Sequence, residues 1–205
     1  MSVNPLARSL PTTVRINGRR WPIRWRVSDC LPVILAYEDE RLTAMEQQEI
    51  LFRRLYPRLP DDLAAAAQAA VEFLDGGPEP PKQEDSVEQE DESEQLVLYS
   101  FSRDGGMIYS AFRARYGIDL VRDELHWWSF LALLGDLGSD CRFYQLLRLR
   151  RGWLEGTLDK EEARAFECMG PDAMPPPQPG DREAEEHALA FLAALNEGGG
   201  LNGIR

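Results

Sequence analysis

Apolar and polar residues alternate over residues 13–25, TVRINGRRWPIRW. This period of two predicts a pair of strands with one apolar face and one arginine-rich face. The apolar positions are Val14, Ile16, Trp21, Ile23 and Trp25. Asn17-Gly18 tolerates the positive φ angles of a type I′ turn, and Pro22 indicates an edge strand because it lacks an N–H. Since a lone hairpin is marginally stable in water, we expect its tryptophan-bearing face to pack on helices.

The following residues have helical patterning. Asp29 is predicted to cap a helix over 30–39, and Thr43 with Glu46 fits a capping box that opens a helix over 44–56. An alanine-rich helix is expected over 61–75. It should end at Gly76-Gly77-Pro78, because glycine and proline break the helical pattern.

A second set of helices is expected after residue 100. Ser102 or Asp104 should start a helix that Gly117 stops, and residues 125–137, LHWWSFLALLGDL, are apolar almost all round, which predicts a helix buried by several neighbours. Further helices are expected after Ser139-Asp140, over 159–169 and over 181–196. The predicted structural core consists of Trp21, Trp25, Ile108, Phe112, Tyr116, Trp127, Trp128 and Leu131.

Charge is concentrated in one stretch. Residues 76–95 hold six Glu, two Asp and one Lys, so they account for −7 of the chain's net charge of −12 and leave −5 for the rest. With almost no apolar residue, this stretch predicts a disordered acidic insertion. The expected fold class is therefore mainly α: a compact helical domain with an N-terminal β-hairpin packed on it.

The composition suggests four segments. Residues 1–75 form the hairpin and its helices, 76–95 the acidic linker, and 96–170 a helical core in the same fold unit as 1–75. Residues 171–205 form a proline-rich loop, a C-terminal helix and a flexible tail.

Several broad classes of protein are disfavoured. No apolar run approaches the roughly 20 residues of a membrane span, and the N-terminus lacks the apolar core of a signal peptide. Three cysteines at scattered spacing indicate reduced thiols in a cytoplasm. Nucleic acid is disfavoured as a partner because the chain is not basic on the domain scale.

No motif assembles an active site. The sequence has no phosphate-binding loop, no metal-ligand spacing and no nucleophile elbow, so no catalytic, cofactor-binding or metal-binding residue is predicted. His126 and His187 are interpreted as structural histidines, with catalysis by His126 as the minor alternative. Arg148 and Arg151 share a helix face and are the candidate partner-binding residues, although a solvated face is the simpler interpretation.

Three stretches together resemble the tailed-phage family known as bacteriophage gp fifteen. They are the hairpin INGRRWPIRW followed by Asp29, the helix SFSRDGGMIYSAFRARYGIDL over 100–120, and LHWWSFLALLGDL. The resemblance covers about residues 13–153 without the acidic insertion. Gly105-Gly106 and the arginine-rich stretch 148–151 depart from the family pattern.

The resemblance implies a non-catalytic tail assembly chaperone that binds the tape-measure protein in the host bacterial cytoplasm. Its expected partners are phage tail proteins, including the tape-measure protein and another tail assembly chaperone. A homo-oligomer is a further alternative. A chaperone of this kind would use apolar grooves between helices. The alternative is a minor structural component of the tail or of the head–tail junction.

Overall fold

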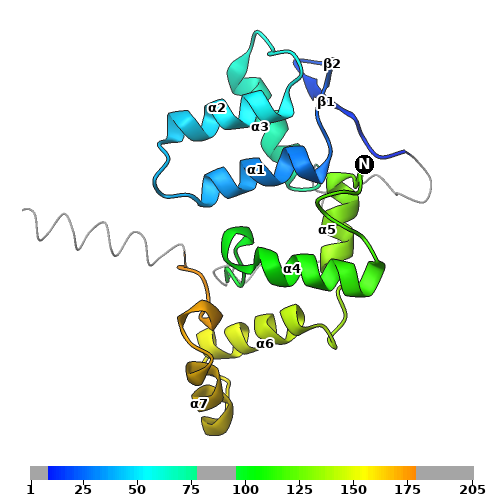
Figure 1. Cartoon of the computed structure of the whole chain (residues 1–205). Coiled ribbons are helices and arrows are strands. Elements are labelled where there is room, and N and C mark those ends of the chain that lie inside the picture. Colours follow the sequence, from blue (N-terminus) through cyan, green and yellow to red (C-terminus); the bar gives the residue numbers. More distant parts are fainter. Residues whose placement is uncertain (1–8, 78–95, 179–205) are drawn as a thin grey trace, which may run out of the picture. The chain divides into compact units, whose positions relative to one another are not determined.

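The computed structural model describes residues 9–77 and 96–178 (Figure 1). These residues form an N-terminal two-stranded hairpin followed by helices, so the predicted fold class, mainly α with an N-terminal hairpin, is confirmed. The strands are β1 (Thr13–Ile16) and β2 (Arg19–Pro22). The helices are α1 (Val27–Glu38), α2 (Ala44–Leu55), α3 (Leu63–Leu74), α4 (Phe101–Tyr116), α5 (Trp127–Gly135), α6 (Arg142–Leu154) and α7 (Lys160–Cys168), followed by a 3₁₀ turn, η1 (Pro171–Ala173).

The chain divides into two compact units. The first consists of Met1–Asp91 with Ser100–Gln145, and the second of Glu92–Tyr99 with Leu146–Arg205. Helix α6 begins in the first unit and continues into the second. Most of the acidic linker and the predicted helix over 181–196 lie outside the described residues.

The hairpin forms around Asn17-Gly18, as its sequence predicts. Asn17 has φ +50° and Gly18 has φ +77°, and Ile16 pairs with Arg19 across the turn. The N–H of Ile23 donates to the carbonyl of Thr12 at 3.1 Å, which extends the pairing beyond β2. Ile16 and Ile23 are buried, and β1 packs against α3.

Two helices of the first unit begin at residues that differ slightly from the predictions. Helix α1 starts at Val27 rather than at residue 30, because the backbone around Arg26 bridges to His126 and fixes the first turn there. Asp29 therefore lies in the first turn and is not the cap. Helix α4 begins after Ser100, whose hydroxyl accepts from the N–H of Arg103, and ends at Gly117 with φ +70°.

Local capping signals behave as predicted in α2. The Thr43 hydroxyl accepts from the N–H of Glu46, whose carboxylate accepts from the N–H of Thr43 at 2.8 Å. At the other end of α2, the Arg24 guanidinium donates to the carbonyls of Arg53 and Arg54 at 2.7 and 3.0 Å. The hairpin thereby satisfies carbonyls that a helix end leaves without a partner.

An aromatic cluster occupies the contact between α4 and α5. Phe130 stacks on Phe112 and on Trp127, with ring centroids 5.1 and 5.2 Å apart. All three rings are buried, as is Ile108 on α4. Stacked rings at these distances contribute about 0.5–1.5 kcal/mol per pair beyond their buried area.

Helix α5 is shorter than predicted and is not buried all round. Trp127 and Phe130 are buried, whereas Trp128 and Leu131 are half-buried, because the neighbouring elements cover only one side of these nine residues. The other residues of the predicted core divide in the same way. Ile108 and Phe112 are buried, while Trp21, Trp25 and Tyr116 are half-buried.

The second unit is organised around a buried arginine. The Arg150 guanidinium is 0% exposed and donates to the carbonyls of Leu98, Asp172 and Ala173. Trp153 of α6 packs against Phe166 of α7, with ring centroids 5.7 Å apart. A single charged side chain thus joins three separate segments of the chain.

Candidate binding grooves

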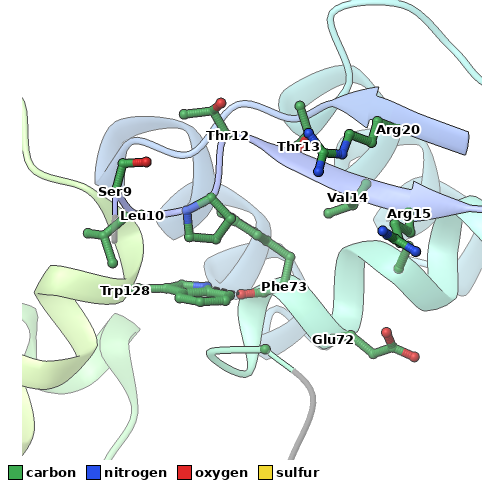
Figure 2. Close-up of a pocket in the computed structure, with 13 residues that line it drawn as sticks. Ser9, Leu10, Thr12, Thr13, Val14, Arg15, Arg20, Glu72, Phe73 and Trp128 are labelled. Carbon is green, nitrogen blue, oxygen red and sulfur yellow. Dashed lines mark hydrogen bonds between the residues drawn. The ribbon is translucent and has the colours of Figure 1, made fainter. Parts of the chain in front are cut away.

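A groove of about 660 Å³ lies between the hairpin and the C-terminal half of α3, and we call it the hairpin groove (Figure 2). Its floor is apolar, with Phe73 of α3 and Trp128 of α5. Arg15 and Arg20 of the hairpin and Glu72 of α3 supply the charged groups. The remaining lining residues are Ser9, Leu10, Pro11, Thr12, Thr13, Val14, Ala69 and Gly77.

The floor of the hairpin groove is held in place by the end of α3. The Trp128 indole N–H donates to the carbonyl of Phe73 at 2.8 Å, and the Trp127 indole donates to the carbonyl of Leu74 at 2.7 Å. Gly77, with φ +100°, donates its N–H to the carbonyl of Glu72 at 2.8 Å. The last carbonyls of α3 therefore have partners, and the Trp128 ring is fixed against the helix end.

His126 links three elements beside the groove. Its Nδ1 accepts from the N–H of Trp128 at 3.0 Å, which caps α5, and its Nε2 lies 2.9 Å from the carbonyl of Pro11. The imidazole stacks on Trp25 with centroids 5.2 Å apart. Burial lowers its pKa below 6.5, against a smaller opposing effect of the Pro11 hydrogen bond. Since Nδ1 accepts and Nε2 donates, the geometry describes a neutral ring.

Around His126, the stretches that carry the family resemblance meet in space. The N–H of Trp127 donates to the carbonyl of Trp25 at 2.7 Å, and the N–H of Val27 donates to the carbonyl of Leu125 at 3.0 Å. An ion pair of 2.7 Å joins Arg26 to Glu124. The hairpin exit and the HWW sequence are thus one structural junction.

Glu38 joins the third stretch to the same unit. One carboxylate oxygen accepts from the N–H of Phe101 at 2.8 Å, and the other accepts from the N–H of Ser102 at 2.8 Å and from the Ser100 hydroxyl at 2.9 Å. Glu38 is the last residue of α1, so it caps α4 from a different helix. Sequence reasoning missed this cap, because its spacing to residue 100 follows no local pattern.

A second groove, of about 450 Å³, lies on the outer face of α2, and we call it the α2 groove. Its lining is mostly apolar, with Met45 80% exposed and Leu59 53% exposed. The other lining residues are Gln48, Glu49, Phe52, Arg53 and Tyr56. The opposite face of α2 buries Leu51 and Leu55, so this helix carries two apolar faces.

The arginines of the stretch 148–151 lie in different surroundings. Arg148 pairs with Glu162 at 3.3 Å, and Arg151 lies 3.9 Å from Glu155, both in exposed positions of the second unit. Arg150 points into the interior of that unit instead. The predicted partner-binding pair thus lies on a surface where each guanidinium already has an acidic neighbour.

Neither a metal cluster nor a membrane-spanning helix is found in the described ranges 9–77 and 96–178. Among the same residues, Cys30, Cys141 and Cys168 are free thiols. Burial raises the pKa of the Cys30 thiol well above its usual range, so this cysteine is protonated at neutral pH.

Comparison with known proteins identifies a family. No curated protein and no solved structure matches the chain. The family model described as bacteriophage Gp15 protein matches residues 6–169 of the 205, which includes all three stretches that meet around His126 and Glu38. The chain therefore belongs to the bacteriophage Gp15 protein family.

Proposed function

We propose that this phage protein is a non-catalytic tail assembly chaperone that binds the tape-measure protein in the host bacterial cytoplasm. Family membership supports a role in phage biology. The single observation that favours a binding role is the α2 groove, where apolar side chains face solvent along a helix.

The spacing in the α2 groove suits a helical client. Met45 and Phe52 are seven residues apart on α2, which is about two helical turns, and Leu59 follows the end of that helix. Apolar side chains at this repeat form a stripe into which an amphipathic helix can lay its own apolar face. Exposed apolar surface of this kind, rimmed by polar residues, is typical of interaction sites.

The charges at the rim of the α2 groove are already paired. Glu49 and Arg53 form an ion pair of 2.6 Å one turn apart on α2. Exposed pairs of this kind contribute little energy, so apolar contact would dominate binding. We therefore expect client binding to weaken little with salt and to show a negative heat-capacity change.

The hydrogen bonds of His126 support a non-catalytic role. Both ring nitrogens have partners, Nδ1 the N–H of Trp128 and Nε2 the carbonyl of Pro11. A general base needs a free nitrogen within reach of a substrate proton. The imidazole is therefore better suited to holding the junction than to moving protons.

The test is co-expression of this chain with the tape-measure protein of the same phage, followed by pull-down across a salt series. Soluble client should be recovered only with this chain and should stay bound at high salt. A Met45→Glu, Leu59→Glu variant should lose the client. Val121→Glu is the matched control, because Val121 is 81% exposed and does not line the α2 groove.

A client that is equally soluble alone, with no complex at any salt, would rule out the chaperone. The alternative, a minor structural component of the tail or of the head–tail junction, is separated by mass spectrometry of purified particles. A chaperone should be absent from them, whereas a structural component should be present. Pull-down with the other tail proteins of the phage tests for a second chaperone partner.

A further inference from the structure

Two arginines face each other across the hairpin without an acidic partner. Arg15 pairs in register with Arg20, and both line the hairpin groove. Like charges directly opposite each other destabilise a strand pair. In the part of the chain that the structure describes, neither guanidinium has an ion pair or a hydrogen bond. The hairpin groove therefore presents two adjacent positive charges that a negatively charged ligand would stabilise.

The edge of β1 also borders the hairpin groove. Because Ile23 donates to Thr12, antiparallel alternation makes Thr13–Pro22 and Arg15–Arg20 the non-hydrogen-bonded pairs. The N–H and C=O groups of Thr13 and Arg15 therefore point away from β2. Four successive residues, 12–15, line the groove, which indicates that it follows the edge of the strand. Such an edge can accept an extended peptide as an added strand.

The chain itself supplies a ligand of opposite charge at the end of the hairpin groove. Gly77 lines the groove, and the described chain stops there and resumes at residue 96. Residues 79–94 carry eight carboxylates and one lysine. The prolines of this stretch, Pro80 and Pro81, lie near its start. From Lys82 onward, every residue of the stretch can therefore donate an N–H to a strand edge.

We propose that the hairpin groove binds the acidic stretch 79–94 of the same chain, as an extended segment beside β1 with carboxylates on Arg15 and Arg20. Covalent attachment at Gly77 favours this occupant, since a linked segment has an effective concentration in the millimolar range. Extended chain covers about 3.3 Å per residue, so four or five residues suffice to pair with β1. The inference is independent of the α2 groove and of the proposed client.

Amide hydrogen exchange of the full chain tests this assignment. The N–H groups of Thr13 and Arg15 should be protected in the wild-type chain. They should exchange at least tenfold faster in a variant whose eight acidic residues over 79–94 are changed to Gln or Asn. Equal exchange in the two chains would overturn the proposal. Protection that disappears on dilution would assign the ligand to a second copy and overturn the assignment to the same chain.

The role of the two arginines is tested by titrating a synthetic 79–94 peptide into the full-chain variant whose own eight acidic residues are changed to Gln or Asn. Arg15→Gln with Arg20→Gln should weaken peptide binding about tenfold at low salt, because two ion pairs are lost. Arg19→Gln is the matched control, since Arg19 lies on the same hairpin but does not line the hairpin groove. Glu72→Gln should tighten binding, because Glu72 is the carboxylate that lines the groove. Equal affinities for the Arg15/Arg20 and Arg19 variants, or no binding, would refute the site.

Discussion

The indole nitrogen of Trp127 lies 2.7 Å from the carbonyl oxygen of Leu74 and donates a hydrogen bond to it. Trp128 makes the equivalent bond to Phe73 at 2.8 Å. Two consecutive residues at the start of α5 therefore cap the end of α3. The described chain stops three residues later, at Gly77. Trp127 and Trp128 thereby connect the segment before the acidic stretch 79–94 to the segment after it.

Trp127→Phe is the first test of this junction. The substitution keeps an aromatic ring in the core but leaves the buried carbonyl of Leu74 without its donor. An unsatisfied buried group costs about 1–3 kcal/mol, so the free energy of unfolding in urea should fall by that amount. Trp128→Phe should cost less, because the bond from Trp128 to the Phe73 carbonyl is only partly buried, whereas the bond from Trp127 to Leu74 is buried. Equal midpoints for wild type and Trp127→Phe would show that the bond does not stabilise the fold.

Local sequence signals predicted the features of this fold whose partners lie close in the chain. Asn17-Gly18, the Thr43–Glu46 capping box and Gly117 each involve residues within a few positions of one another, so propensity alone identifies them. These signals establish where the hairpin and most of the helices lie. They do not establish how those elements meet.

The features that sequence reasoning missed join distant residues. Glu38 caps a helix that begins at residue 101, and His126 bonds to Pro11. The predicted all-round burial of α5 failed for a related reason. A continuous apolar sequence does not reveal that Trp128 uses its N–H on a helix end and keeps one side of its ring toward a groove.

Gly77→Ala tests the close approach of the chain to Trp128. Gly77 has φ +100°, and a Cβ at this position would lie 2.6 Å from Cη2 of the Trp128 ring. The positive φ alone costs about 1–2 kcal/mol for alanine, and the ring must also shift from its bond to Phe73. We expect a loss of about 2 kcal/mol or more in urea denaturation.

Gly105→Ala is the matched control for that substitution. Gly105 lies within α4, and a Cβ there meets nothing within 4 Å. Alanine should stabilise the helix by about 0.5–1 kcal/mol. If Gly77→Ala raised the midpoint as Gly105→Ala should, the close approach of Gly77 to Trp128 would be refuted.

Glu38→Gln tests the cap that α1 supplies to α4. Glutamine keeps one oxygen but places an NH₂ group against an N–H donor at Phe101 or Ser102. Loss of a helix cap costs about 0.5–2 kcal/mol, and amide exchange in the first turn of α4 should quicken accordingly. Glu124→Gln is the control, since the pair that Glu124 forms with Arg26 is exposed. Similar effects of the two substitutions would contradict a specific cap.

His126 predicts a dependence of stability on pH. Its pKa in the folded state is lowered below 6.5 by burial, so the unfolded chain takes up the proton first as the pH falls. The contribution of the neutral ring is therefore fully present above pH 6.5 and is lost as the pH falls through the folded-state pKa. The melting temperature should drop as the pH falls below about 6.5.

His126→Asn should remove that dependence, because asparagine can cap α5 without titrating in this range. Glu46 does not obscure the window. The pKa of Glu46 is lowered from 4.5 by its hydrogen bonds with Thr43, so its contribution is lost only at lower pH. His187→Gln is the control for the second histidine. A slope unchanged by His126→Asn would assign the pH dependence elsewhere.

Arg150 provides the last prediction, which concerns the second unit. Its guanidinium donates to the carbonyls of Leu98, Asp172 and Ala173 at 3.0, 3.1 and 2.8 Å. Arg150→Met fills a similar volume but removes all three donors, and hydrogen bonds from charged groups contribute about 1.5–3 kcal/mol each. We expect a loss of roughly 3 kcal/mol or more, measured as faster amide exchange over 96–99 and 146–178.

Two further variants, Arg150→Lys and Arg151→Met, distinguish the loss of hydrogen-bond geometry from the loss of charge. Arg150→Lys keeps the charge but cannot reproduce the planar fork, so its effect should lie between wild type and Arg150→Met. Arg151→Met should change stability by about 0.5 kcal/mol or less, because the Arg151 side chain is 60% exposed. If amide exchange were equally fast in Arg150→Met and Arg151→Met, the stability of the second unit would not depend on its buried arginine. A selective effect of Arg150→Met would instead show that the basic stretch 148–151 contains a structural residue beside exposed ones.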